Sequence, residues 1–153
     1  MRLSKRGEYG LRAMILLAAS CRPSAPLPML QIREISERER IPAKYLEHIL
    51  LTLKNAGLLH SRMGIGGGYS LARPPAEISL GQVFRVLDGP LAPLRCVSQT
   101  AYAPCGCPDE HTCGLRLAMG AVRNAISDIL DHTSLADVNN WQESVQHMLD
   151  ASC

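Results

Sequence analysis

The sequence predicts a mainly α-helical fold with one small β-hairpin, arranged as a winged helix-turn-helix followed by a long dimerisation helix. Apolar residues recur at helical spacing along most of the chain, a glycine-rich run separates two short strand-like segments, and a long amphipathic segment follows a cysteine-rich one. With 153 residues and 46% hydrophobic content, the chain can bury one modest core or two small linked ones. We expect three regions, at residues 1–75, 76–112 and 113–153.

The first region opens with an amphipathic helix. Ser4 can cap a helix that runs to about Cys21. Three prolines within residues 22–28 end it. Its apolar residues fall on one face, which we expect to pack in the core and not to bind a ligand: Leu11, Met14, Ile15, Leu17 and Ala18.

Residues 30–38 and 42–56 predict two further helices joined by a tight turn. Pro42 suits the first turn of the later helix, because its missing amide donor would have no intrahelical partner there, and Gly57 ends that helix. Outside the apolar stripe lie Lys44, Tyr45, Glu47, His48 and Thr52. Such a pair is a helix-turn-helix, whose second helix lies in the major groove of DNA. An ordinary αα-hairpin has the same helical pattern.

A glycine-rich run at residues 64–68 predicts a β-hairpin wing. Strand-like runs flank it at residues 58–63 and 69–72. Arg62 and the bare backbone amides of Gly64 and Gly66 suit phosphates or a narrow minor groove. A nucleotide-binding loop is disfavoured, because neither a Lys-Ser or Lys-Thr pair nor a helix follows the glycines.

Charge is divided unevenly along the chain. Residues 1–73 hold 12 Lys or Arg and 5 Asp or Glu, a net +7, whereas residues 74–153 hold 4 and 9, a net −5. We therefore expect the first half to meet a polyanion, double-stranded DNA. The longest apolar stretch, residues 14–20, is too short to span a bilayer, and the basic start has no signal-peptide cleavage site, so we expect a cytoplasmic protein with no membrane partner.

The second half predicts a short helix, a loop and a long helix. Ser79 can cap a helix over residues 80–87, residues 91–112 show no periodicity, and residues 113–131 resume a helix with a broad apolar face. A stripe of that length predicts contact with the same helix of a second subunit, although packing within one chain would also explain it. Further helical turns are expected at residues 135–138 and 141–149.

Four cysteines lie close together in and beside this loop: Cys96, Cys105, Cys107 and Cys113. Clustered thiols in a chain without a signal peptide indicate metal ligation or redox chemistry and not structural disulfides. We rank an iron–sulfur cluster first, a thiol switch second and zinc third, since the paired spacing typical of zinc sites is absent. His111 could ligate, but an exposed loop histidine is the simpler reading.

The chain resembles the Rrf2 family of winged-helix transcriptional regulators along almost its whole length. The matching motifs are residues 1–4 with Tyr9, residues 11–14, 41–47, 53–58, 66–69 and 86–89, Cys107 to Cys113 with Leu115-Arg116, and residues 134–137. The resemblance implies a homodimer on a roughly palindromic operator, with Ala43, Lys44, Tyr45 and Glu47 at the front of the recognition helix and the wing in the minor groove. Several relatives have an arginine directly before the first wing glycine, where this chain has Met63.

In cluster-binding branches of the family, three cysteines of this loop hold iron, which the resemblance places at Cys96, Cys107 and Cys113. Cys105 is extra and could replace Cys107. Glu8, from this chain or its partner subunit, is the weaker candidate for a fourth ligand. The resemblance implies a regulator, not an enzyme, that senses iron–sulfur status or redox or nitrosative stress. The alternatives are a metal-free regulator responding to thiol oxidation, a metabolite or a partner enzyme, and, less favoured, a cluster-bearing electron carrier or metalloenzyme.

Overall fold

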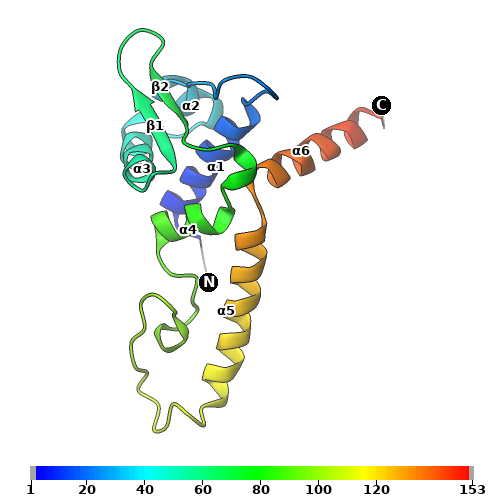
Figure 1. The fold of residues 1–153 in the computed structure, drawn as a ribbon. Coiled ribbons are helices and arrows are strands. Elements are labelled where there is room, and N and C mark those ends of the chain that lie inside the picture. The colour runs from blue at the N-terminus through cyan, green and yellow to red at the C-terminus, as the bar shows by residue number, and fades with distance from the viewer. Residues whose placement is uncertain (1–2, 152–153) are drawn as a thin grey trace.

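The computed structural model describes residues 3–151, so residues 1–2 and 152–153, Cys153 among them, lie outside the described part of the chain. Three helices and a two-stranded hairpin come first, and three more helices follow (Figure 1). The elements are α1 (Lys5–Ala19), α2 (Ile32–Glu39), α3 (Ala43–Asn55), β1 (Leu59–Arg62), β2 (Gly68–Leu71), α4 (Leu80–Asp88), α5 (Gly114–His132) and α6 (Leu135–Asp150), with 3₁₀ turns at Pro75–Glu77 and Arg95–Val97. This confirms a mainly helical fold with one small hairpin.

Three of the helices begin at a serine whose side chain caps the first turn. The Ser4 hydroxyl accepts a hydrogen bond from the Gly7 amide at the start of α1. Ser79 and Gln82 form a reciprocal capping box at the start of α4. Ser134 and Asp137 form another at the start of α6, which the sequence reading did not anticipate.

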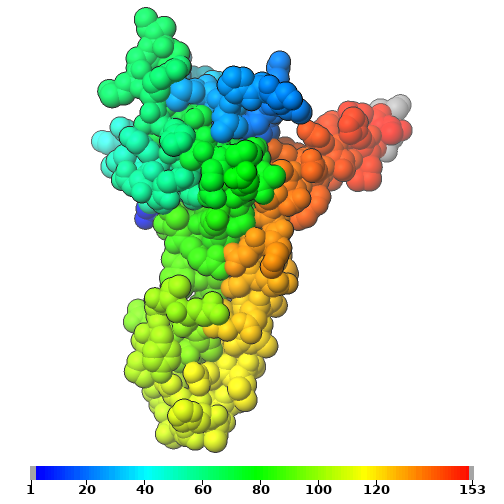
Figure 2. Space-filling view, in the orientation of Figure 1, coloured from blue at the N-terminus to red at the C-terminus, as the bar shows by residue number. Residues whose placement is uncertain are grey.

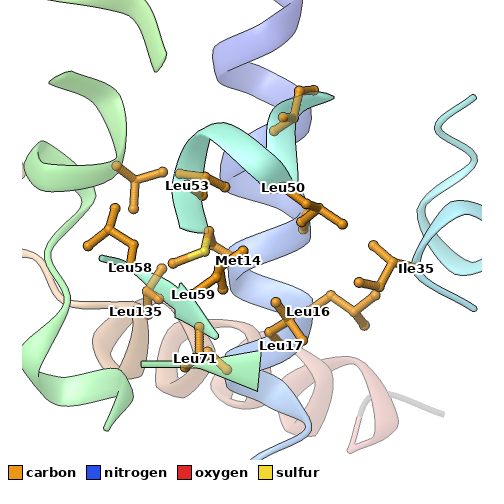
Figure 3. Close-up of a cluster of buried hydrophobic side chains, with 14 of the residues drawn as sticks. Met14, Leu16, Leu17, Ile35, Leu50, Leu53, Leu58, Leu59, Leu71 and Leu135 are labelled. Atoms are coloured by element: carbon orange, nitrogen blue, oxygen red, sulfur yellow. The ribbon is translucent and has the colours of Figure 1, made fainter. Parts of the chain in front are cut away.

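One apolar core joins the first three helices, the hairpin and the start of α6. Its fully buried side chains include Met14 and Leu17 of α1, Leu50 and Leu53 of α3, and Leu59 and Leu71, which pair across the hairpin (Figure 3). Leu135 enters the same core from the start of α6. The hairpin and α3 are therefore held on one packed unit.

The second half is arranged differently. Helix α5 runs from the cysteine-rich end of the molecule back to the core, and α6 then projects away from it (Figure 1). No described residue of α5 is buried. Backbone hydrogen bonds join its end to the core, from Leu80 N to Thr133 O at 2.9 Å and from Leu135 N to Ile78 O at 2.9 Å. No helix in residues 3–151 is long and apolar enough to cross a bilayer.

The structure corrects several of the predicted helix boundaries. Pro42 is the N-cap residue of α3 and lies just outside the helix, and α1 ends at Ala19. The two helical turns expected in the tail are one continuous helix, α6. The loop that shows no periodicity contains the 3₁₀ turn Arg95–Val97.

Candidate nucleic-acid interface and cysteine loop

The turn between α2 and α3 fixes the direction of α3. Arg40 takes a left-handed conformation with φ 53°, which lets the chain reverse after one residue. The Ile41 amide donates to the Ser36 carbonyl at 3.1 Å, and the Ser36 hydroxyl donates to the Ile41 carbonyl at 2.6 Å. Because Ile41 is also buried, the turn is held by both packing and hydrogen bonds.

Helix α3 presents a polar face away from the core. Leu46, Ile49, Leu50 and Leu53 are buried, and the opposite surface is exposed. All five residues assigned to the recognition helix lie on the exposed surface: Ala43, Lys44, Tyr45, Glu47 and His48. Thr52 is half-buried, and its hydroxyl accepts a hydrogen bond from Arg6 of α1 at 2.9 Å.

A brace from α1, which the sequence reading missed, supports this surface. The rings of Tyr9 and Tyr45 meet edge to face, with centroids 5.8 Å apart. Arg12 lies over the Tyr9 ring and pairs with Glu39 at the end of α2, with Nε and Oε2 3.0 Å apart. These contacts orient Tyr45, and their signal in the sequence was the pair Tyr9 and Arg12 at spacing i, i+3 on α1.

The wing, residues 59–71, is a hairpin whose strands pair from Leu59 with Leu71 to Arg62 with Gly68. Gly64 and Gly66 have φ angles of 92° and 70°, so their presence is explained by backbone conformation alone. Gly68 lies so close to Leu30 that an added Cβ would stand 2.3 Å from the Leu30 carbonyl oxygen. The Arg62 guanidinium folds back and donates to the Gly66 carbonyl at 2.9 Å.

In the cysteine loop, residues 89–113, each of the four thiols lies beside at least one other thiol. Cys96 is buried, and the other three are half-buried. The Sγ atoms of Cys107 and Cys113 are 3.7 Å apart. Neighbouring Cys105, and then Cys113, raise the pKa of Cys107, while burial and then Cys105 raise the pKa of Cys96. Cys105 therefore lies next to both Cys96 and Cys107.

Cys113 differs from the other three thiols because it is the N-cap residue of α5. The backbone N–H group of Arg116 lowers the pKa of Cys113, followed by the neighbouring Cys107 and the N–H group of Leu115. The positive end of a helix favours a thiolate over a thiol. Cys113 is thus prepared to act as a ligand or as a nucleophile.

The distance between two of the thiols allows them to bind one metal atom. Two thiolates bonded at about 2.3 Å to one tetrahedral metal have their sulfur atoms roughly 3.8 Å apart. The separation of Cys107 and Cys113, 3.7 Å, matches that arrangement. Within residues 3–151 no three His, Cys, Asp or Glu side chains are grouped so as to hold one metal ion. Thiolates are also the protein ligands of iron–sulfur clusters, so the loop offers donors of the type that such a cluster needs.

Two arginines of α5 hold the loop against the helix: Arg116, which was named from the sequence only as part of the family motif, and Arg123, which was not singled out. Arg116 donates to the carbonyl oxygens of Cys96 and Glu110, both at 3.3 Å, and Arg123 donates to the Val97 carbonyl at 2.7 Å. They stand seven residues apart, two helical turns, on one face of α5. That spacing is the signal that could have identified them.

Within the loop, Glu110 supports Cys105. Its carboxylate accepts hydrogen bonds from the Tyr102 hydroxyl at 2.6 Å and from the Cys105 amide at 2.8 Å. The Tyr102 hydroxyl, followed by the Cys105 amide, lowers the pKa of Glu110. His111 is exposed, in agreement with the simpler reading of that residue.

Glu8 lies on α1 in ion pairs with residues of its own helix. Its carboxylate is 2.9 Å from Lys5 Nζ and 3.7 Å from Arg12 Nη1. The hydrogen bond from Lys5 lowers the pKa of Glu8. In this arrangement Glu8 pairs with cations and not with a thiol of the cysteine loop.

One ion pair connects α4, which precedes the cysteine loop, with α5, which follows it. Arg85 meets Asp131 in a bidentate pair, with N–O distances of 2.5 and 2.8 Å. Gly81 makes room for it, since an added Cβ would lie 2.0 Å from Asp131 Oδ1. The far end of α4 is tied to α1, because the Ser4 amide donates to Asp88 Oδ2 at 2.8 Å.

Known proteins resemble this chain along most of its length. A family model described as Rrf2, iron-dependent transcriptional regulator, matches residues 3–140. An rrf2-like HTH-type regulator of Rhodobacter capsulatus is 39% identical over 137 residues, covering 89% of this chain and 91% of the relative. The structure of CymR, the global cysteine regulator of Bacillus subtilis, superposes with a TM-score of 0.74 at 29% identity, covering 92% and 98% of the two chains. The structure of T. potens IscR gives 0.74 at 29% identity, covering 95% and 91%.

Proposed function

Because the chain belongs to the Rrf2 family of winged-helix transcriptional regulators, we propose that it acts as a homodimer and senses iron–sulfur status, or redox or nitrosative stress, through a cluster held by the cysteine loop. The observation that carries the proposal is the series of four thiols on a loop attached to α5. The same helix ends in the core that holds the recognition helix.

The DNA contacts are assigned to the exposed front of α3 and to the wing. Ala43, Lys44, Tyr45, Glu47 and His48 form one continuous exposed surface at the start of the helix. Arg62 lies at the base of the wing tip, where its guanidinium can meet a phosphate. The net charge of +7 over residues 1–73 supports a polyanionic partner on this side.

The second subunit is assigned to the exposed apolar surface of α5 and α6. On α5 this surface comprises Leu115, Leu117, Val122 and Ile129, and on α6 it comprises Trp141, Val145 and Leu149. Apolar side chains in this number on two successive helices mark an association surface. A symmetric pairing would set the distance between two recognition helices.

For the cluster, the assigned ligands are Cys96, Cys107 and Cys113, with Cys105 as the fourth. Cys107 and Cys113 would supply two neighbouring ligands, and Cys105 lies next to both Cys96 and Cys107. Glu8 is the weaker alternative, because it would have to leave Lys5 and Arg12. When bound, the cluster supplies a redox-active centre that oxidants and nitric oxide can attack.

The chain's own residues connect this loop to the DNA-binding surface. Arg116 holds the Cys96 carbonyl against α5, so a change in the position of Cys96 acts directly on the start of that helix. The Arg85–Asp131 pair passes the displacement to α4, which packs on α1 and α3. A shift of α5 would alter the separation of the two recognition helices and hence the fit to the operator.

A metal-free thiol switch is the second candidate, and the distance between Cys107 and Cys113 favours it. Their Sγ atoms need to approach by less than 2 Å to reach the bond length of a disulfide, about 2.05 Å. Oxidation by a peroxide would remove two electrons from the two thiols, form one S–S bond and release two waters from hydrogen peroxide. No metal is required for this step.

The test is anaerobic purification followed by visible spectroscopy and assays of iron and acid-labile sulfide. We expect a coloured protein with thiolate-to-iron absorbance, and expect Cys113→Ser to lose both the colour and the iron. Cys21→Ser is the matched control, since Cys21 lies at the end of α1 and its Sγ contacts the Leu17 carbonyl. A colourless, iron-free wild-type protein in which air links Cys107 to Cys113 would establish the thiol switch instead.

A further inference from the structure

The wing tip, residues 63–67, carries two large apolar side chains at the narrow end of the molecule. Met63 is 96% exposed and Ile65 107% exposed, the most exposed large hydrophobic residues in the described part of the chain. Figure 2 shows the wing projecting beyond the surface formed by the helices. Apolar side chains in full contact with water at a projecting tip indicate a surface that is covered when a partner binds.

The tip is narrow because glycines flank Ile65. Gly64 and Gly66 hold positive φ angles of 92° and 70°, and neither places a side chain beside the isoleucine. No atom lies within 4 Å of a Cβ added at Gly64. The end of the hairpin is therefore one backbone turn bearing one branched apolar side chain. The minor groove of B-DNA, about 6 Å wide, accepts an element of this size.

The charge of the wing is tied to its backbone and does not extend past the tip. Arg62 donates to the Gly66 carbonyl at 2.9 Å, so its guanidinium is folded back against the turn. An arginine that reads a narrow minor groove must extend into it. Here the residues placed to enter are Met63 and Ile65, and Arg62 is placed to meet a phosphate at the groove edge.

We infer that Ile65 and Met63 enter the minor groove of the operator as an apolar wedge and partly unstack one base step. Isoleucine and methionine are among the side chains that act in this way in minor-groove binding proteins. The net charge of +7 over residues 1–73 favours DNA over an apolar protein surface as the occupant. The inference rests on the proposed function, because it requires an operator.

The wedge has a consequence for sequence preference. Pyrimidine–purine steps such as TA and CA unstack at low cost, whereas A-tracts are stiff. The wing therefore selects a deformable step at the position it touches. An arginine in the groove would select a narrow A-tract instead, so the two modes of contact predict opposite preferences.

The experiment uses a duplex selected in vitro from a randomised pool by the full-length wild-type protein, with 2-aminopurine at the step under the wing. We expect wild type to raise the 2-aminopurine fluorescence on binding. The Met63→Ser, Ile65→Ser double variant should lose that signal and bind about tenfold more weakly. Replacing the step by an A-tract should weaken wild type but not the double variant. Ile65→Met is the matched control and should keep both the signal and the affinity.

The outcomes separate the two proposals. Double-variant binding equal to wild type, or a wild-type preference for an A-tract under the wing, would overturn the wedge and leave the proposed function standing. A wild-type protein that selects no duplex would overturn the proposed function itself, and the wedge with it. Both side chains are fully exposed, so the substitutions leave the core unchanged, which circular dichroism can verify.

Discussion

The first and second halves of the molecule keep their shape by different means. In the winged helix, side chains of α1, α3 and the hairpin are fully buried in a shared core. In the cysteine loop and α5 the contacts are mainly polar: two arginines on backbone carbonyls, one carboxylate on an amide, and thiols on one another. Polar contacts at a solvent-exposed surface contribute little stability each, so this half can rearrange without unfolding the other.

This difference would suit a protein in which a loop that responds to a signal is joined to a rigid DNA-binding unit. A recognition helix must keep its geometry to within fractions of an ångström, which close packing provides. A loop that gains or loses ligands must change its conformation at low cost. The Arg85–Asp131 pair stands where the two kinds of structure meet. Substitutions on either side of it should therefore have separable effects.

The largest effect is expected in the packed core. Leu50 is fully buried, and Leu50→Ala should lower the free energy of unfolding by about 3 kcal/mol through lost transfer energy and a residual cavity. Leu117→Ala on α5, where the side chain is 70% exposed, should change it by less than about 0.5 kcal/mol in the isolated chain. Chemical denaturation of the two variants at low protein concentration measures both. Equal losses would contradict the contrast between the two halves.

A charge on α5 should affect association and not folding. Leu117→Asp places a carboxylate in the surface assigned to the second subunit, and we expect the dimer to dissociate at about a hundredfold higher concentration. Sedimentation velocity over a range of concentrations measures the shift. Circular dichroism should remain that of wild type. Leu3→Asp, an exposed apolar residue near the start of α1, is the control and should leave the oligomeric state unchanged.

The same contrast explains how much of the molecule could be predicted from its sequence. Helix starts followed from local capping chemistry at Ser4 and Ser79, and the wing followed from glycines with positive φ, because each of these signals acts over a few residues. The continuity of α6 was missed, although its Ser134–Asp137 capping box is a local signal; the burial of Leu135 and its backbone bond to residue 78 depend on contacts with the core.

The candidate site was predicted less completely for the same reason. The exposed front of α3 followed from helical periodicity, and the four cysteines followed from their spacing. The position of Cys105 beside Cys96, and the arginines that hold the loop, depend on contacts between segments up to 26 residues apart. The fold-back of Arg62 onto Gly66 is set by the shape of the turn, which spacing alone does not give.

A smaller effect is expected at Lys44, which should contact a phosphate. Lys44→Gln should weaken DNA binding about fivefold and reduce the slope of log affinity against log salt by about 1, because one fewer counterion is released. Fluorescence anisotropy with the selected duplex at several salt concentrations measures both quantities. Lys54→Gln, at the last turn of the same helix, is the matched control. Unchanged affinity and slope in Lys44→Gln would remove that residue from the interface.

The smallest effect on stability, and the one that addresses the junction itself, is expected from Asp131→Asn. Arg85 lowers the pKa of Asp131, so the stabilisation is complete above the ordinary pKa of an aspartate, about 4, and is lost as the pH falls through the lower pKa of the folded state. Because both side chains are about one-third exposed, the loss in the variant should not exceed about 1 kcal/mol, and it should become smaller as the pH is lowered below about 4. The effect on regulation should be larger than the effect on folding. If α4 and α5 are coupled through this pair, DNA binding by Asp131→Asn should respond less than wild type to oxidation of the cysteine loop, whereas a full response would show that the signal passes by another route.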